Sequence, residues 1–241
     1  EIGKKIPKTL VKIQQKPILW YILKILLKNK INHFIFPIGH KGKLIKNFLK
    51  RFKKECKQEI LIDVVETGKN TIIANRIFKV SPKIISDNFL LLNGDAIFDF
   101  NLSKIIKNHI KSNLHLTLMT CKVISPFGVV VTKDNKPVNF KRDMLYDSLN
   151  INNSIYKGSI FTGMSLINKK ILNSVNYKLF SNFEISFYPK ILKRSKSSYT
   201  QINGFWYAMD NPKEIIVANK IDKKNKISKY ISQLKKRIYN D

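Results

Sequence analysis

The sequence of 241 residues has little cysteine and no long apolar run, and each shortage excludes a class of protein. Two cysteines, Cys56 and Cys121, cannot form a disulfide framework and have no CxxC partner, which favours a reducing compartment such as the cytoplasm. No uncharged apolar stretch reaches about 18 residues, so we expect no membrane span. We therefore expect a cytoplasmic protein that does not act at a membrane.

Acidic residues and arginine are also scarce. The chain carries 45 Lys and Arg residues against 16 Asp and Glu residues, a net charge of +29, yet only five of the 45 are Arg. Proteins that read nucleic acids usually rely on the bidentate guanidinium, and here the lysines are dispersed along the chain. We therefore expect solvated helix faces and no nucleic-acid partner, with a basic nucleic-acid-binding α/β module as an alternative. A phosphorylated substrate would suit this positive field.

Several common catalytic signatures are missing. Gly68 and Lys69 stand in TGKNT, which is not a phosphate-binding P-loop because Asn70 follows the lysine. The chain has no GxGxxG or GxSxG, and its four histidines lack the spacing of a zinc or catalytic site. The chemistry must therefore come from other residue types.

The hydrophobic pattern in the first half alternates between strands and helices. Helices are expected at 16–30, 43–57, 70–80 and 102–112, and strands at 31–38, 60–65, 89–92 and 114–123. This alternation predicts an α/β protein whose mostly parallel, Rossmann-like sheet has helices on both faces.

From residue 127 the pattern changes. A hairpin is expected at 127–140, with Asp134 and Asn135 at its turn, and further strands at 159–167 and 198–209. Helices are expected at 183–192, 212–221 and 227–239. No linker or repeat divides the chain, so residues 1–241 are predicted to form one domain with a small antiparallel appendage.

Asp95 is the first candidate for chemistry. It follows the apolar run of 89–92 and Gly94, which allows close approach of the backbone to a ligand. In open α/β sheets, ligands bind outside the carboxyl ends of the strands, so a carboxylate there suits a metal–phosphate ligand. The alternative is structural: Asp95 caps a turn ahead of the helix that begins near Leu102.

Asp210 is a second strand-end acid, after the run of 204–209 and before Asn211 and Pro212. Mg²⁺ binds one or two carboxylates together with substrate phosphates, so Asp95 and Asp210 on one rim would form a magnesium site. The alternative is again structural, with Asp210 as the N-cap of the following helix. Lys8 and Arg76 carry no signal by themselves, because each is one cation among many.

Five segments taken together resemble the sugar-1-phosphate nucleotidylyltransferases. They are residues 7–11 with 16–19 (PKTLV…KPIL), 31–42 (INHFIFPIGHKG), 92–95 (LNGD), 161–163 (FTG) and 204–210 (GFWYAMD). Their order and spacing cover nearly the whole chain. The segment VETGKNT at 65–71 with Arg76, and the spacing GFWxxMD, are similar to the glucose-1-phosphate cytidylyltransferase branch. Guanylyl-, uridylyl- and thymidylyltransferases remain alternatives.

The resemblance implies an enzyme that transfers a nucleotidyl group from a nucleoside triphosphate, with CTP preferred, to a sugar-1-phosphate and releases pyrophosphate. It implies that Lys8 contacts the phosphates at the reacting centre, and that Asp95 and Asp210 hold Mg²⁺. The remaining implied roles follow the motifs: nucleotide binding by Thr67, Gly68, Arg76 and Gly94, and sugar binding by Thr162, Gly163 and Glu184. The chemistry needs positioning and charge neutralisation, which explains the absence of a nucleophile.

The sequence departs from this family in three places. The family's first strand and Gly-rich loop should precede Pro7, so the domain is expected to lack both. Arg142 stands where the family has a phosphate-binding lysine, whereas the preceding Lys141 cannot replace a sugar-binding glutamate because it accepts no hydrogen bonds. Ala74 and Asn75 replace the glycines expected before Arg76. A non-catalytic regulatory relative is therefore a further alternative, and a homo-oligomer is left open.

Overall fold

The computed structural model describes residues 6–122, 129–142, 144–145, 148–152, 154–175, 182–222 and 224–239. The predicted strand end at residue 123 and the first two residues of the hairpin expected at 127–140 lie outside these ranges. Within the described residues, no helix has the length and apolarity needed to cross a bilayer.

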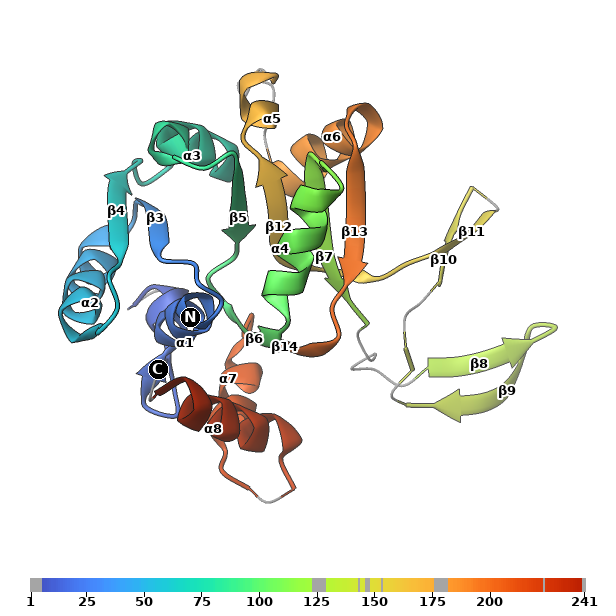
Figure 1. Cartoon of the computed structure of the whole chain (residues 1–241). Helices are drawn as coiled ribbons and strands as arrows, with labels where there is room; N and C mark the ends of the chain where they lie inside the picture. Colours follow the sequence, from blue (N-terminus) through green and yellow to red (C-terminus); the bar gives the residue numbers. More distant parts are fainter. Residues whose placement is uncertain are drawn as a thin grey trace.

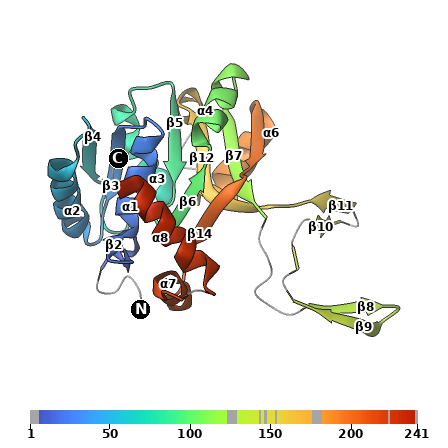
Figure 2. The same ribbon diagram turned by 60° about the horizontal axis from the view of Figure 1, so that its bottom comes forward.

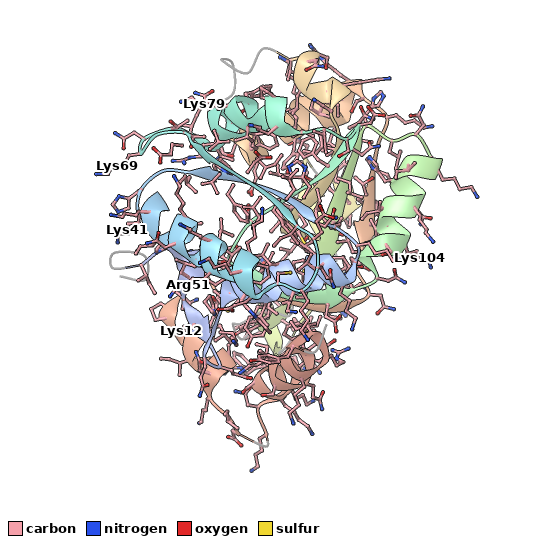
Figure 3. All side chains as sticks on the ribbon, turned by 60° about the vertical axis from the view of Figure 1, so that its left-hand side comes forward. Lys12, Lys41, Arg51, Lys69, Lys79 and Lys104 are labelled. Atoms are coloured by element: carbon pink, nitrogen blue, oxygen red, sulfur yellow. The ribbon has the colours of Figure 1, made fainter. Side chains whose placement is uncertain are left out.

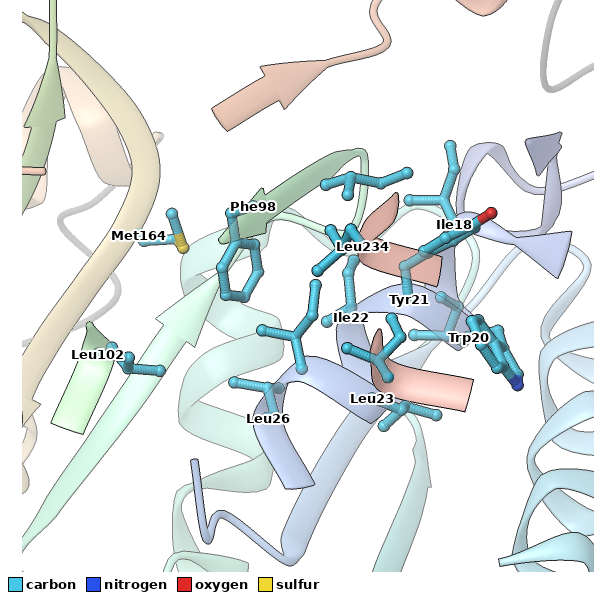
Figure 4. Close-up of a cluster of buried hydrophobic side chains, with 14 of the residues drawn as sticks. Ile18, Trp20, Tyr21, Ile22, Leu23, Leu26, Phe98, Leu102, Met164 and Leu234 are labelled. Carbon is cyan, nitrogen blue, oxygen red and sulfur yellow. The ribbon is translucent and has the colours of Figure 1, made fainter. Parts of the chain in front are cut away.

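Helix α1 (Ile18–Lys28) lies at the centre of the larger hydrophobic core. Pro17 precedes it, and all of its residues except Lys24 and Lys28 are buried, because apolar side chains occupy the rest of its circumference. Leu23 and Leu26 belong to one buried cluster with Phe98, Leu102 and Leu234, which come from three other elements (Figure 4). Ahead of α1 the chain forms a short turn and hairpin: η1 (Lys8–Leu10), β1 (Lys12–Ile13) and β2 (Lys16–Pro17).

The first half of the chain alternates as expected. The elements that follow α1 are β3 (His33–Ile38), α2 (Gly42–Glu55), β4 (Leu61–Glu66), α3 (Ile73–Val80), η2 (Ser81–Lys83) and β5 (Asn88–Leu92). Strands β3 and β4 are parallel, joined by α2 (Figure 1). The predicted helices and strands of this half are therefore confirmed, with ends shifted by up to three residues.

A four-stranded sheet in the order β13-β7-β12-β5 forms the other part of the body. Its strands are β7 (Leu116–Cys121), β12 (Ile160–Asn168) and β13 (Ser197–Gln201) beside β5, with α4 (Leu102–Lys111), α5 (Lys170–Asn173), η4 (Phe183–Phe187) and α6 (Tyr188–Arg194) around it. Two clusters of buried side chains form, one with α1 and α4 and the other with α3, α5 and α6. Helices thus cover both faces, which confirms the α/β class. Strand β12 lies antiparallel between β5 and β7, so the β13–β7 ladder is the parallel one of this sheet, which differs from the mostly parallel sheet expected. The apolar pattern does not reveal strand direction.

The strand expected at 198–209 is divided into two strands. β13 pairs in parallel with β7, whereas β14 (Gly204–Ala208) pairs antiparallel with β6 (Ala96–Phe100) in a separate ladder. The chain changes sheets at Ile202, whose N–H still bonds to Thr120 O at 2.7 Å. Prediction of one strand was wrong because an apolar run does not show where its pairing partner changes.

Two hairpins extend from the body (Figures 1 and 2). Strands β8 (Val129–Lys133) and β9 (Lys136–Lys141) form the first, and Asp134 and Asn135 occupy its turn with positive φ as expected. Strands β10 (Ser148–Ile151) and β11 (Ser154–Lys157) form the second. The chain closes with α7 (Pro212–Asn219) and α8 (Lys226–Tyr239), and α8 packs on α1.

Candidate functional site

The ladder between β6 and β14 brings Asp95 and Asp210 to one rim. Ala208 pairs with Ala96, and the Met209 N–H bonds to Asp95 O at 2.9 Å, which extends the register by one residue. The next step places Asp210 opposite Gly94, diagonal to Asp95. Two acids that are 115 residues apart in the sequence therefore lie on one edge.

Neither acid serves as a helix cap. Helix α4 is capped by Asn101, whose side chain accepts the Lys104 N–H at 2.9 Å. Helix α7 is capped by Asn211 in a capping box with Glu214, and the Glu214 carboxylate also accepts the Asp210 N–H at 2.5 Å. Because both caps come from other residues, the carboxylates of Asp95 and Asp210 are left for a different role.

Lys8 completes a charged group at this rim, which we call the acid rim (Lys8, Asp95 and Asp210). Its Nζ lies 3.4 Å from Asp210 Oδ1, and both side chains are largely exposed. Burial raises the pKa of Asp95, the nearby charge of Asp210 raises it further, and Lys8 opposes the shift. The rim thus holds two carboxylates that repel each other and a lysine with one long contact. A multivalent cation would reduce the repulsion between the carboxylates, and phosphates could bind the lysine.

Gly94 leaves room for this arrangement. A Cβ at position 94 would overlap the Cγ2 atom of Thr9, so the loop after β5 and the η1 turn approach each other without a side chain between them. The Oγ1 atom of Thr9 is buried and has no hydrogen-bond partner among the described residues. Close packing here fixes Lys8, the neighbour of Thr9, beside the acids.

Thr162 and Gly163 adjoin the same rim through Asn93. The Asn93 N–H bonds to Gly163 O at 3.0 Å, and a Cβ on Gly163, whose φ is 75°, would overlap the Asn93 side chain. The Thr162 hydroxyl is buried and donates to Met119 O at 2.9 Å, while its carbonyl accepts the Trp206 Nε1–H at 3.1 Å. Thr162 therefore anchors the strand, and Gly163 is the member of the pair whose missing side chain lets Asn93 pack closely.

A second group gathers around Arg76, and we call it the Arg76 loop (Thr67, Gly68, Thr71 and Arg76). The guanidinium donates to Thr71 O at 2.8 Å, Thr67 Oγ1 at 2.8 Å and Gly68 O at 2.9 Å. Thr67 in turn donates to Ile38 O at 2.9 Å. Most of the guanidinium donors are used internally, so Arg76 holds the loop in one shape.

The surroundings of the Arg76 loop are basic. Lys41, Lys69 and Lys79 lie on one side of the molecule in Figure 3, and Lys79 Nζ bonds to Thr67 O at 2.8 Å. A Cβ on Gly39 would overlap Gly68 O and the Arg76 guanidinium, so the turn after β3 abuts the loop. A negatively charged ligand would be attracted to this side.

Two predicted site residues are not brought to the acid rim. Arg142 is exposed and follows β9 on a hairpin that projects from the body (Figure 2), and among the described residues no contact joins it to the acid rim. Glu184 is exposed in η4, where its N–H bonds to the side chain of Asn182. Neither side chain reaches Asp95, Asp210 or Lys8 in this conformation.

The donor set of the acid rim fits magnesium. Among the described residues, no cluster of three or more His, Cys, Asp or Glu side chains forms a complete protein-made metal site. Mg²⁺ does not need one, because it binds through one or two carboxylates and takes its other oxygens from water and phosphates. Asp95 and Asp210 are the residues that would hold it.

Comparison with known proteins identifies the family. The family model described as nucleotidyl transferase matches residues 1–225. The chain belongs to the nucleotidyl transferase family.

Its similar relatives differ in the base that their names specify. The chain is 26% identical over 238 residues to a probable glucose-1-phosphate cytidylyltransferase of Bacillus subtilis, covering 92% of this chain and 90% of that protein. It is 29% identical over 154 residues to the D-glycero-alpha-D-manno-heptose 1-phosphate guanylyltransferase of Aneurinibacillus thermoaerophilus, covering 63% of this chain and 65% of that protein. Both names include a sugar-1-phosphate.

Solved structures share the fold. HddC from Yersinia pseudotuberculosis superposes with a TM-score of 0.63 at 18% identity, over 87% of each chain. The inositol-1-phosphate CTP transferase from T. maritima gives 0.63 at 16% identity, over 97% of this chain and 89% of that one. At these identities the likeness shows the fold, in agreement with the Rossmann-like expectation.

Sequence reasoning missed the supporting residues. Glu214, Asn93 and Thr9 position the acid rim, yet each is an ordinary polar residue in the sequence. No element is predicted from the sequence at the residues of β6, although their AIFDF run of apolar and aromatic residues was an available signal for a strand.

Proposed function

We propose that this chain transfers a nucleotidyl group from a nucleoside triphosphate to a sugar-1-phosphate in a magnesium-dependent reaction that releases pyrophosphate. The observation that carries the proposal is the acid rim: two strand-end carboxylates, neither used as a cap, beside a lysine with one 3.4 Å contact. The sugar-1-phosphates in the relatives' names and the family match support it.

The reaction requires that a phosphate oxygen of the sugar-1-phosphate approach the α-phosphorus while negative charge increases. Mg²⁺, when bound by Asp95 and Asp210, would neutralise phosphate charge and orient the triphosphate. Lys8 supplies a mobile ammonium at the same place, where it can follow the charge as pyrophosphate departs. Asp210 keeps this lysine at the rim in the absence of substrate.

The two remaining groups would hold the ends of the substrates. Gly163, against which Asn93 packs, would contact the sugar, with Thr162 fixing the strand from behind. The Arg76 loop would hold the nucleotide, and we propose that Arg76 acts on it as a positioning residue through Thr67 and Gly68. Arg142 and Glu184 would contribute only if their segments move toward the substrates.

We propose CTP as the preferred triphosphate. The TGKNT loop with Arg76 and the GFWxxMD spacing favour it, and the first relative above is named a cytidylyltransferase. GTP, UTP and dTTP are the alternatives, since another relative is named a guanylyltransferase. Two unpaired cysteines suit a reducing compartment, and we propose a cytoplasmic location.

Pyrophosphate release with Mg²⁺ tests the proposal across a grid of four nucleoside triphosphates and several sugar-1-phosphates. Release that needs both substrates supports the reaction, and the strongest triphosphate identifies the base. A folded protein that binds neither substrate nor Mg²⁺ would contradict it and favour a non-catalytic relative. Strong salt-dependent binding to DNA or RNA would instead favour the nucleic-acid module.

A further inference from the structure

Strand β12 is irregular at the place where the sugar site is proposed. Its register against β7 shifts between Phe161 and Ser165, so residues 162–164 stand opposite Met119 alone. Gly163 lies inside this bulge and has a φ of 75°, which a residue with a side chain rarely adopts. Bulges bend a strand, leave backbone groups without ladder partners and are frequent next to active sites. The bulge therefore needs hydrogen bonds from outside the ladder to keep one shape.

Two side chains supply hydrogen bonds to the bulge. The Thr162 hydroxyl donates to Met119 O at 2.9 Å on the β7 side. The Thr162 carbonyl, which lies outside the regular pairing, accepts the indole N–H of Trp206 at 3.1 Å. A backbone carbonyl released from a ladder needs a donor, and the indole offers one donor and no acceptor. The Trp206 side chain is therefore matched to this carbonyl.

The indole bond controls the direction of one peptide group. The Thr162 carbonyl and the Gly163 N–H belong to the same planar trans peptide unit, so they point in opposite directions. When Trp206 holds the carbonyl, it also fixes the N–H of Gly163, the residue that would contact the sugar. The following carbonyl, of Gly163 itself, accepts the Asn93 N–H at 3.0 Å. Both peptide groups that flank Gly163 are thus held, one by Trp206 and one by Asn93.

Trp206 also joins the proposed sugar site to the acid rim. It belongs to β14, the strand that leads to Asp210, and β14 and β12 lie in separate sheets. Neighbouring side chains of a strand point to opposite faces. Phe205 accordingly stacks on Tyr230 of α8, with ring centroids 4.3 Å apart, whereas Trp206 points to β12. The indole bond therefore links the strand that carries one acid of the rim to the strand that carries the bulge.

We propose that Trp206 is a positioning residue for the sugar-1-phosphate, because its indole N–H sets the direction of the peptide group between Thr162 and Gly163. The inference rests on the proposed function, since that function assigns the sugar to Gly163. A hydrogen bond that only supported the fold would affect the binding of both substrates alike or of neither. A positioning bond at this place should affect the sugar-1-phosphate alone.

Steady-state kinetics of Trp206→Phe test the inference. The substrates are the pair that gives the fastest pyrophosphate release with the parent protein, and CTP with glucose-1-phosphate is the first pair tried. We expect KM for the sugar-1-phosphate to rise about tenfold, the effect of one lost hydrogen bond, with KM for the triphosphate within about twofold of the parent value. Trp20→Phe makes the same exchange at a ring that is 6% exposed in the larger core, and it should change neither KM.

An isosteric replacement separates the N–H group from the packing of the ring, and it decides the question if Trp206→Phe does not fold. The chain has two tryptophans, so in the Trp20→Phe protein a tryptophan analogue occupies position 206 alone. Benzothienylalanine has sulfur in place of the indole N–H and keeps the bicyclic shape, so it should raise KM for the sugar-1-phosphate about tenfold. A fluorotryptophan keeps the N–H and should leave this KM at the value of the Trp20→Phe protein.

Three results with an active parent protein would overturn the inference alone. They are an unchanged KM for the sugar-1-phosphate in the benzothienylalanine protein, an equal rise of both KM values, and the same rise with fluorotryptophan. A folded parent protein that releases no pyrophosphate with any substrate pair would instead overturn the proposed function, and the inference with it.

Discussion

The acid rim and the Arg76 loop are both candidate parts of one site, but they are built in opposite ways. Lys8 and Asp210 meet across 202 positions of sequence through a single exposed contact of 3.4 Å. Arg76 meets residues five to nine positions away and gives most of its donors to their oxygen atoms. The rim has charges left for a ligand, whereas the loop has already used its charge to fix its own shape.

This contrast separates chemistry from positioning. A group that neutralises developing charge must have free donors or acceptors at the moment of reaction. A group whose donors are satisfied within the protein acts through the shape that it maintains. The predictions below follow from this difference.

The largest effect is expected for Asp95→Asn, which should reduce kcat about 10³-fold because the rim loses a charged ligand for Mg²⁺. The same change should raise Tm in the absence of Mg²⁺. The raised pKa of Asp95 means that its ionised form is less favourable in the folded chain than in the unfolded chain, so the carboxylate lowers stability as the pH rises through that pKa. Steady-state kinetics and thermal unfolding at neutral pH measure both effects. A lower Tm would show that the acid is structural.

Lys8→Met should lower kcat about 10²-fold with little change in Tm, because an exposed ion pair contributes little to stability. Lys12→Met removes an exposed lysine four residues away and is the matched control for net charge. Equal losses in both variants would indicate that the general positive field, and not Lys8, supports the reaction.

Magnesium binding should weaken as the pH falls. Protons compete for Asp95 across a range above the ordinary pKa of an aspartate, because burial and the charge of Asp210 raise its pKa. Calorimetric titration with Mg²⁺ between pH 4 and 7 should show one proton released per ion in the lower part of this range. Affinity that does not depend on pH would place the ion elsewhere.

Arg76→Lys should change binding more than chemistry. A lysine cannot bridge Thr67, Gly68 and Thr71 at once, so the loop loosens, and KM for the nucleoside triphosphate should rise about tenfold with kcat nearly unchanged. Arg51→Lys on α2 makes the same exchange of residue types outside the Arg76 loop, and it should have no effect. A fall in kcat with constant KM would move Arg76 from positioning to the reacting centre.

The smallest effect is expected for Arg142→Ala, because this residue lies on a hairpin that projects from the body. Activity should remain within about threefold of the parent protein, because the exposed Arg142 side chain makes no contact with the acid rim. A loss as large as that of Lys8→Met would show that the hairpin closes over the substrates and that Arg142 contacts their phosphates.

A further stability test concerns His109, outside both groups. Burial lowers the pKa of His109, with a smaller contribution from His115, and its ring bonds to Thr117 Oγ1 at 2.7 Å. The neutral ring is favoured in the folded chain, so its stabilising contribution is complete above pH 6.5 and decreases as the pH falls below that value. Unfolding of His109→Gln by urea should show a weaker loss of stability between pH 7 and 5 than the parent.

The sequence by itself determined the α/β class and most helices and strands, and it drew attention to Asp95 and Asp210 as acids at strand ends. Apolar periodicity and strand-end position depend on local order, so they can be seen without coordinates. The same local pattern also allowed Asp95 and Asp210 to be cap residues instead of metal ligands. Only the caps observed at Asn101 and Asn211 exclude the capping role.

The tertiary structure alone decided which residues meet. The split of 198–209 between two sheets, the antiparallel insertion of β12 and the meeting of Lys8 with Asp210 depend on pairing partners far away in the sequence. Local composition determines what a segment can form, whereas long-range packing and hydrogen bonding determine its neighbours, and the chemistry of this site depends on the neighbours.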